Sequence, residues 1–479
     1  MSNINFDTIV VGNGAIGSSI AYELSSRGQK VAIVGKEARE SAASTAAGAM
    51  NGCYGEVTES LMKSEFGRKK LLMDIKAKNM WEGWLSKLTK DSGDEREVII
   101  AHGTEVILNT AGTSDVDSVN FMKIEQALKE NSERYEIVDP DNHVWLKADE
   151  QVRPLKALLI PEENAVDPNI LLAKLSKAIR NLGGTLFNEH ALSVMTEGNQ
   201  VCGIELSEQK IYAKNIIIAA GVQSLDLLDF DLELKNKIPP MFSGYGVSIL
   251  LELDDIENYN RVIRTPNRAF ACGLHCVPRN GKELYIGATN ILSDIPRKNA
   301  YVSDVQFLLD CAVEQLHLDL FNADIKKIQV GNRPIPADGF PLIGQIKYDG
   351  LWLATGTYRD GLHQSPLIAE HLANAISGIE NDIDLSDFHP IRKPLYNTPR
   401  HELIAKTTSE MFATGYEYRW DVQPYWHPIL EKGMLHSFEE ILDELHKEFA
   451  PPPEILSLYL THPKSSKEQL RTYYNAWSE

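Results

Sequence analysis

The sequence lacks long apolar runs and any excess of positive charge. No stretch approaches the roughly 20 apolar residues that a membrane-spanning helix requires, and the formal net charge is −19 at pH 7. An acidic surface of this kind repels both nucleic-acid phosphates and anionic lipid headgroups. We therefore expect neither a nucleic acid nor a membrane as a partner of this protein.

Cysteine is scarce as well. Five cysteines among 479 residues are too few, and odd in number, for a disulfide framework. Residues 1–6 lead almost directly into an apolar strand and show none of the regions of a secretory signal. The pair Cys272 and Cys276 has no further ligand nearby except His275, so we expect no metal site. These features favour a cytoplasmic protein with reduced thiols.

A glycine-rich turn follows the first apolar segment of the chain. Gly12, Gly14 and Gly17 form a GxGxxG pattern, followed by a predicted helix over residues 18–27 and a predicted strand over residues 31–34. In such a unit the first glycine permits a tight turn, the second lets the backbone approach a pyrophosphate, and the third lets helix and strand pack closely. The pattern predicts a dinucleotide site.

The carboxylate that usually accompanies this turn is missing. Gly35 stands at the tip of the second predicted strand, where a ribose-binding Asp or Glu is expected. Glu37 is the nearest carboxylate and would bind a ribose hydroxyl if the strand ends early. Lys36 would instead neutralise phosphate charge. Water or backbone groups are the remaining candidates for the ribose.

Further along, the chain returns to the same kind of unit. Asp167 and Pro168 predict the start of a helix that continues to Leu182. Short strands are predicted after it, over residues 185–187, 192–195, 201–206 and 216–218. The last of these runs into Ala219-Ala220-Gly221, and this small-residue turn predicts a second contact with the same nucleotide.

The motifs form an ordered series. GxGxxG is followed by STAAGAM, a VDP helix, IIIAAGVQS, HCVPRNGKELYIGAT, NRPIPADGFPLIG and LWLATGTYRDGLHQSP. Over residues 5–385 this series resembles the FAD-dependent D-amino-acid oxidase family, and most resembles its glycine oxidase branch. The resemblance implies an α/β fold with a Rossmann-type FAD-binding domain. An interleaved α+β substrate domain with an antiparallel sheet and a mainly helical C-terminal extension complete the expected architecture.

The resemblance also divides the chain into domains. It assigns residues 1–90, 150–230 and 330–390 to the FAD-binding domain, and residues 91–149 and 231–329 to the substrate domain. Residues 391–479 are an extension that a glycine oxidase does not have. The extension is rich in Tyr, Trp and Pro and contains an amphipathic helix. It packs on its own body, covers the pocket or a subunit interface, or binds a partner protein.

The resemblance implies noncovalent FAD, because the places where relatives attach the flavin hold no Cys or His here. After TYRDG a helix is predicted over residues 367–376, with Pro366 near its first turn, and its start would stabilise the negative charge of reduced flavin. The residues expected to contact FAD are Gly12, Gly14, Ala15, Ile16, Gly17, Lys36, Glu37, Ser44, Thr45, Ala47, Gly48, Val194, Ala220, Gly221, Gly356, Arg359, Asp360, Gly361, Leu362 and His363.

Four residues are expected in the catalytic pocket. Arg333 occupies the position that binds a substrate carboxylate in the family, although an ion pair with Asp338 is an alternative for it. Arg359 falls on a second arginine position of the glycine oxidase branch. His275 and Asn290 replace a tyrosine and a methionine, which favours a substrate with an additional polar group. His275 is a candidate proton acceptor, or else a partly exposed residue bound to water.

The implied function is oxidation of the C–N bond of an amino acid or amine. Hydride passes from the α-carbon to flavin N5, and water hydrolyses the resulting imine. O2 or another acceptor then reoxidises the flavin. Two alternatives remain open: a flavoprotein that oxidises a different bond in a biosynthetic intermediate, and an FAD-binding subunit of a hetero-oligomeric dehydrogenase.

Overall fold

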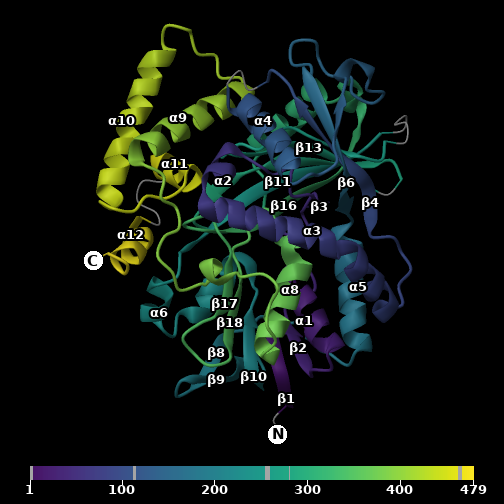
Figure 1. Ribbon diagram of the computed structural model, residues 1–479, viewed down its shortest axis with the longest axis vertical. Coiled ribbons are helices and arrows are strands. Elements are labelled where there is room, and N and C mark those ends of the chain that lie inside the picture. Colours follow the sequence, from purple (N-terminus) through teal and green to yellow (C-terminus); the bar gives the residue numbers. More distant parts are fainter. Residues whose placement is uncertain (1–3, 112–114, 254–258, 280, 462–466, 479) are drawn as a thin grey trace.

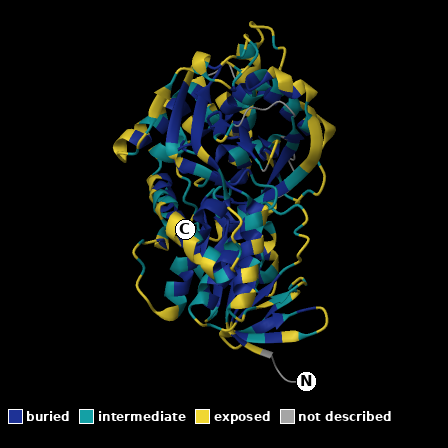
Figure 2. Ribbon diagram, turned by 90° about the vertical axis from the view of Figure 1, so that its right-hand side faces the viewer, coloured by how far each residue is buried: buried dark blue, intermediate teal, exposed yellow. Residues whose placement is uncertain are grey.

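The computed structural model describes residues 4–111, 115–253, 259–279, 281–461 and 467–478. Figure 1 shows two sheets stacked end to end, with a group of C-terminal helices packed along one side of the upper sheet. Buried residues concentrate in the strands of both sheets and in the layer between them, whereas exposed residues follow the outer helix faces (Figure 2). The expected three-part architecture is confirmed.

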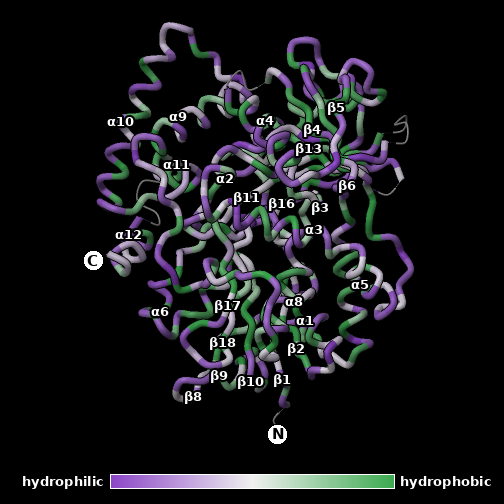
Figure 3. Tube along the Cα trace, viewed as in Figure 1, coloured by the Kyte–Doolittle hydropathy of each residue, from purple (hydrophilic) through white to green (hydrophobic). Residues whose placement is uncertain are grey.

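The lower sheet is built around a parallel core. The predicted strands over residues 31–34 and 216–218 lie on either side of the first strand of the chain, and their apolar runs are buried on both faces. Figure 3 shows apolar stretches gathered on these strands. The spatial order is β17 (Leu342–Gln345), β18 (Leu351–Thr355), β10 (Lys210–Ile218), β1 (Ile4–Val11), β2 (Val31–Val34) and β7 (Thr185–Phe187), with β8 (Ser193–Glu197) and β9 (Gln200–Glu205) beside β10.

Helices cover one face of this sheet. They are α1 (Ala15–Ser26), α3 (Glu65–Ser92), α5 (Pro168–Asn181) and α8 (Gly361–Ser377). The Asp167 cap of α5 is confirmed, since its carboxylate accepts hydrogen bonds from the backbone N–H groups of Asn169 and Ile170 at 2.8 and 3.1 Å. Both α1 and α8 begin earlier than the sequence pattern indicates, so Pro366 lies inside α8 rather than in its first turn.

The upper sheet is largely antiparallel. Its strands, in spatial order, are β15 (Ile291–Ser293), β11 (Met241–Glu252), β14 (Glu283–Thr289), β13 (Ala271–Pro278), β12 (Val262–Arg264), β4 (Ile99–Leu108), β6 (Lys156–Val166) and β3 (Met50–Asn51), with β16 (Asp324–Pro336) on β11 and β5 (Glu136–Val138) on β6. The strands β3 and β6 come from segments that the domain division assigns to the nucleotide domain. That division remains a prediction.

Helices flank the upper sheet and form the C-terminal extension. The flanking helices of the upper sheet are α2 (Glu59–Lys63), α4 (Asp115–Glu130) and α7 (Val302–Gln315), whereas α6 (Leu232–Asn236) lies beside the lower sheet (Figure 1). The extension consists of α9 (Arg400–Glu417), α10 (His427–Leu445), α11 (Pro453–Thr461) and α12 (Lys467–Asn475). One buried cluster joins Phe438, Leu442 and Tyr459 of the extension to Phe242 and Ile335 of the upper sheet. The extension therefore packs on its own body.

Several further features bear on the expected partners. In the described ranges, no helix is both long enough and apolar enough to cross a membrane. The same residues contain no group of three or more acidic, cysteine or histidine side chains arranged for a metal ion. Cys53, Cys202, Cys276 and Cys311 are free thiols, while the side chain of Cys272 lies outside the described part of the chain.

Candidate active site

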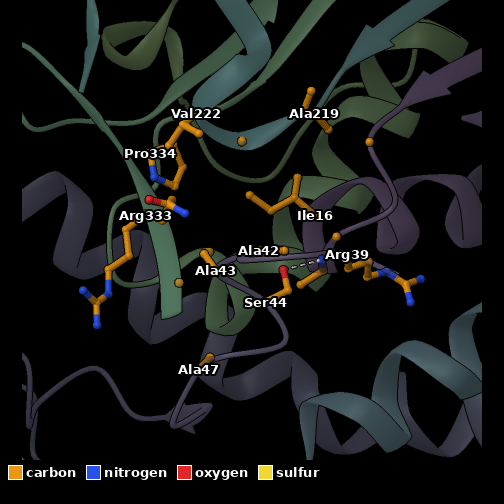
Figure 4. Close-up of a pocket in the computed structure, with 18 of the residues that line it drawn as sticks. Ile16, Arg39, Ala42, Ala43, Ser44, Ala47, Ala219, Val222, Arg333 and Pro334 are labelled. Carbon is orange, nitrogen blue, oxygen red and sulfur yellow. Dashed lines mark hydrogen bonds between the residues drawn. The ribbon is translucent and has the colours of Figure 1, made fainter. Parts of the chain in front are cut away.

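A cavity of about 880 Å³ lies between the two sheets. It begins at the tips of β1, β2 and β10 and ends against β11, β13 and β16 of the upper sheet. Arg39 and Arg333 lie at opposite sides of the region drawn in Figure 4. The predicted FAD-contact residues that line the cavity are Gly12, Gly14, Ala15, Ile16, Lys36, Ser44, Ala47, Gly48, Ala220, Gly221, Arg359, Asp360, Gly361, Leu362 and His363.

The glycine-rich turn is built for close backbone approach. Gly12 has a φ of 115°, and a β-carbon there would lie 2.5 Å from the carbonyl carbon of Ala219. At Gly14, a β-carbon would lie 3.0 Å from the hydroxyl oxygen of Ser44. That hydroxyl accepts a hydrogen bond from the backbone N–H of Ala15 at 2.9 Å (Figure 4). The start of α1 and the Ser44 loop thus form one surface of the cavity.

Asn13 explains why position 35 carries no side chain. A β-carbon at Gly35 would lie 2.6 Å from Asn13 Cγ, so the asparagine fills the place of the missing carboxylate. Asn13 is held there by the hydrogen bond that its Nδ2 donates to the carbonyl of Lys36 at 3.0 Å. Glu37 is exposed, pairs with Arg180 at 3.4 Å and is not among the cavity-lining residues. Binding of a ribose hydroxyl by Glu37 remains a prediction, and the exposed position of this side chain does not support it.

Arg39 lies at the end of the cavity that holds the glycine-rich turn, and the sequence pattern did not reveal it. It lines the cavity with a φ of 44° and donates from Nε to the carbonyl of Asn13 at 2.9 Å. Burial lowers its pKa from the ordinary arginine value. Together with Lys36 it places positive charge where a phosphate-bearing ligand would lie. An arginine five residues beyond the second strand carries no recognisable spacing signal, which is why sequence reasoning missed it.

Arg333 lies at the other end of the cavity. The pairing of β16 with β11 sets Arg333 opposite Gly244, and Nη1 donates to the carbonyls of Thr289 and Gly244 at 3.1 and 3.4 Å. In the described part of the chain, this guanidinium has no ion-pair partner. The alternative of a pair with Asp338 is wrong, because Asp338 receives two hydrogen bonds of 2.8 Å from Arg392.

His275 is buried on β13. Its Nδ1 donates to the carbonyl of Gly273 at 3.0 Å, and its ring stacks on Tyr285 with centroids 5.6 Å apart. Burial, together with the charge of Arg264, lowers its pKa to about 3. This pKa does not favour a proton acceptor that titrates near neutrality, and that role remains a prediction. The expectation of a partly exposed side chain is wrong, because His275 is buried. A neutral ring leaves Nε2 as a hydrogen-bond acceptor beside Gly48.

Tyr358 links the remaining predicted pocket residues. It adopts a φ of 53°, and Arg359 donates to its hydroxyl at 3.0 Å while stacking over its ring. Arg359 lines the cavity and also donates to the carbonyl of Arg268 at 3.1 Å. Asn290 donates to the Tyr358 hydroxyl and to the carbonyl of Ala269, and it is not among the cavity-lining residues. Asn290 therefore supports Tyr358 from outside the cavity.

Glu56 is an acidic residue of the cavity wall that sequence reasoning missed. Its carboxylate is paired with Arg264 and hydrogen-bonded to Asn267. Burial alone would raise its pKa, but the charges of Arg264 and Arg359 hold the pKa of Glu56 at about 2. The carboxylate is therefore ionised near neutral pH. Three segments distant in sequence meet here, so no local pattern marks the residue.

The start of α8 forms another wall of the cavity. A β-carbon at Gly361 would lie 3.4 Å from Ile16, so α8 begins beside the start of α1. Asp360 accepts a hydrogen bond of 2.5 Å from the ammonium of Lys70 on α3. His363 donates from Nε2 to the carbonyl of Asp74 at 2.8 Å. Within the described residues, its buried Nδ1 has no hydrogen-bond partner.

Some predicted contact residues do not reach the cavity. Gly17 and Gly356 are packed against the Gly12 carbonyl and Pro336, respectively. Thr45 turns its hydroxyl to the carbonyl of Ala42 at 3.2 Å. Val194 is buried in β8 and absent from the cavity lining. These four residues support the walls, and their direct contact with FAD remains a prediction.

Comparison with known proteins decides the family. Residues 7–375 match the family model described as DAO, FAD dependent oxidoreductase. The chain belongs to the DAO family. It is therefore an FAD-dependent oxidoreductase, and FAD is its cofactor. The resemblance drawn from the ordered motifs is confirmed.

Two relatives and one solved structure are similar to most of this DAO-family chain. A bifunctional protein ThiO/ThiG of Nostoc sp. (strain PCC 7120) is 24% identical over 392 residues, which cover 80% of this chain and 54% of that protein. The chain thus spans about half the length of this relative. A glycine oxidase of Bacillus licheniformis is 26% identical, over 78% of this chain and 93% of its own. The crystal structure of glycine oxidase from Geobacillus kaustophilus has a TM-score of 0.69 at 21% identity, covering 81% and 99% of the two chains.

The cavity of this DAO-family chain fits FAD. At one end, Gly12 and Gly14 form a cradle that β-carbons would fill, next to the start of α1. Lys36 and Arg39 supply positive charge at the same end. The start of α8, which lies beside the start of α1, and Nδ1 of His363, which has no hydrogen-bond partner among the described residues, offer polar groups to a flat heterocycle. Lys36, Ser44 and the α8 residues are the groups that would hold the cofactor.

Proposed function

We propose that this protein oxidises the C–N bond of an amino acid. The observation that carries the proposal is Arg333, a cavity-lining guanidinium whose described hydrogen bonds go to carbonyl oxygens alone. A partly buried cation without a counter-charge is costly, and an anionic ligand would relieve that cost. A guanidinium matches a carboxylate bidentately. The relatives named glycine oxidase support an amino acid as the source of that carboxylate.

The residues of the pocket divide the work of binding and orientation. Bound FAD supplies the two-electron acceptor. Arg333 holds the carboxylate and thereby fixes the position of the α-carbon. His275 is neutral, so its Nε2 accepts a hydrogen bond from the substrate amine rather than its proton. Glu56 and Tyr358 make the wall polar, which favours a substrate with a further hydroxyl, amide or amine group.

We extend the proposal to the electron acceptor, the protein partner and the cellular compartment. O2 or another acceptor takes the electrons, and water hydrolyses the imine product. Free thiols at Cys53, Cys202, Cys276 and Cys311 favour a reducing compartment, and we place the protein in the cytoplasm. The exposed side chains of Trp420, Tyr425, Trp426 and Ile429 support a homo-oligomer or a protein partner bound through the extension.

Anaerobic reduction of the bound flavin tests the proposal. Purified protein loaded with FAD is mixed with both enantiomers of a panel of amino acids, with N-substituted glycines, and with the matched 2-hydroxy acids. We expect amino acids to bleach the flavin absorbance and to yield ammonia or a primary amine. Bleaching by hydroxy acids alone would favour oxidation of a C–OH bond. No bleaching by any amino acid, in protein that dithionite bleaches fully, would contradict the proposal.

A further inference from the structure

Lys70 is a buried lysine held between two carboxylates. Its ammonium lies 3.0 Å from Asp74 Oδ2, one turn further along α3, and 2.5 Å from Asp360 Oδ2, immediately before α8. The three side chains are at most 10% exposed. Asp360 lines the cavity, so this charge triad of Lys70, Asp74 and Asp360 adjoins the cofactor site. With all members ionised, the triad has one positive and two negative charges.

The triad joins α3 to α8, but helix capping does not account for it. Asp360 occupies the N-cap position of α8, yet its side chain makes no capping hydrogen bond and turns to Lys70 instead. Buried ion pairs are often replaceable by apolar side chains without loss of stability, because desolvation offsets their attraction. A charged cluster placed beside a cavity is therefore a candidate for an electrostatic role in that cavity.

Asp360 connects the triad to the residues around the proposed substrate position. Asp360 is adjacent to Arg359, and the charge of Glu56 acts on both Asp360 and His275. The charge of Arg333, which would bind the substrate carboxylate, also acts on His275, so the redox ring of FAD would lie near these residues. Reduction places negative charge on that ring. The start of α8 stabilises such charge, whereas the net negative charge of the triad opposes it.

We propose that Lys70, Asp74 and Asp360 set the reduction potential of bound FAD through the net charge of their cluster. The three side chains act as tuning groups through their electric field and bind neither substrate nor product. Lys70 cancels one of the two carboxylates. The inference rests on FAD as the cofactor and is independent of the substrate, so failure of the proposed amino acid oxidation would leave it standing.

Two variants separate charge from structural damage. Asp360→Asn keeps the shape and changes the net charge from −1 to zero, so we expect a higher midpoint potential. A tenfold shift toward reduced flavin corresponds to about 30 mV for a two-electron couple. The double variant Asp360→Asn with Lys70→Met returns the net charge to −1, and its potential should return toward that of the wild type. Structural damage would not be reversed by a second lesion.

The experiment is an anaerobic potential titration of each FAD-loaded protein against a reference dye at pH 8. Burial raises the pKa of Asp360 despite Lys70, to about 6, with Asp74 and Glu56 as the nearby acids, so Asp360 is ionised at pH 8. The sequence of potentials should be wild type, then higher in Asp360→Asn, then near wild type in the double variant. A change below threefold in Asp360→Asn, or a further rise in the double variant, would overturn the inference.

Two further variants, Lys69→Met and Asp74→Asn, serve as controls. Lys69 is the neighbouring lysine on α3 and pairs with Asp387 at 2.5 Å, but it is not among the cavity-lining residues. Lys69→Met should leave the potential within about twofold of the wild-type equilibrium because the exposed pair is screened by solvent. Asp74→Asn also removes one negative charge from the triad, so it should raise the potential as Asp360→Asn does. Agreement between these two variants guards against a folding defect in either one.

Discussion

The backbone of Gly246 lies directly under the guanidinium of Arg333. A β-carbon at position 246 would lie 2.7 Å from Arg333 Cζ. Because Gly244 pairs with Arg333 and Gly246 with Gly331, all of these residues face the same side of the β11–β16 ribbon. The glycines of β11 thus leave a trough in which the arginine side chain rests against the cavity.

The first prediction is that Gly246→Ala impairs the enzyme without removing its cofactor. The added methyl group displaces the guanidinium, so kcat/KM for the amino acid substrate should fall by about tenfold to a hundredfold, the value of a charged hydrogen bond of about 1.5–3 kcal/mol. The absorbance of bound flavin should stay at its wild-type level. Steady-state kinetics together with the visible spectrum check both expectations.

Gly83 offers the matched control for that substitution. It lies within α3, and a β-carbon there would meet no atom within 4 Å. Gly83→Ala should leave kcat/KM unchanged and raise the free energy of unfolding by about 0.5–1 kcal/mol. If Gly246→Ala behaved like Gly83→Ala, the close packing of Arg333 on β11 would have no catalytic importance.

The second prediction concerns the absent ribose carboxylate. Gly35→Glu should weaken FAD binding by about tenfold or more, although it restores the acid usual in dinucleotide folds, because the new side chain clashes with Asn13. Adding Asn13→Gly removes the obstacle. The double variant should bind FAD at least as tightly as the wild type, with a gain of about 1 kcal/mol from one hydrogen bond. Fluorescence titration of the apoprotein measures each dissociation constant, and tighter binding by Gly35→Glu alone would refute this account.

The third prediction follows from the depressed pKa of His275. The folded protein holds the ring neutral down to about pH 3, whereas the unfolded chain binds its proton near pH 6.5. Between these values the unfolded state carries more protons, so this residue makes stability rise with pH, by up to about 1.4 kcal/mol per pH unit. His275→Asn, which cannot take up that proton, should lose less stability than the wild type on acidification from pH 6.5. Parallel slopes in urea unfolding of both proteins would contradict it.

The fourth prediction tests whether the extension is part of the folded body. Phe438 on α10 is fully buried in the cluster shared with Phe242 and Ile335 of the upper sheet. Phe438→Ala should lower the free energy of unfolding by about 3–5 kcal/mol. Ile429, on the same helix, is 68% exposed, and Ile429→Ala should change it by no more than about 0.5 kcal/mol. Equal effects of the two substitutions would mean that the extension folds apart from the body.

The local units of the fold could be predicted from the sequence, because their signals are local. The glycine turn, the Asp167 cap and the strand before Ala219 each occupy a few consecutive residues. The start of α8 differs from the prediction, because proline is typical of a first helical turn, whereas α8 begins at Gly361 and holds Pro366 in its buried interior. The joining of β3 and β6 to the upper sheet depends on long-range pairing, which periodicity alone does not reveal.

Residues of the site could be predicted only where they belong to a recognisable sequence motif. Arg333, Gly12 and Gly14 follow from their motifs and line the cavity. Glu56, Arg39 and the Lys70–Asp360 pair arise where segments far apart in the chain meet. The pKa of His275 could not be inferred either, since its burial and the nearby charge of Arg264 are properties of the assembled fold.

The most direct measurement compares one amino acid substrate with the amine that lacks its carboxylate, in the wild type and in Arg333→Ala. The account predicts that the wild type prefers the amino acid by about tenfold to a hundredfold in kcat/KM, and that this preference disappears in Arg333→Ala while FAD remains bound. A preference that survives the substitution unchanged would contradict the assignment of Arg333 as the carboxylate-binding residue.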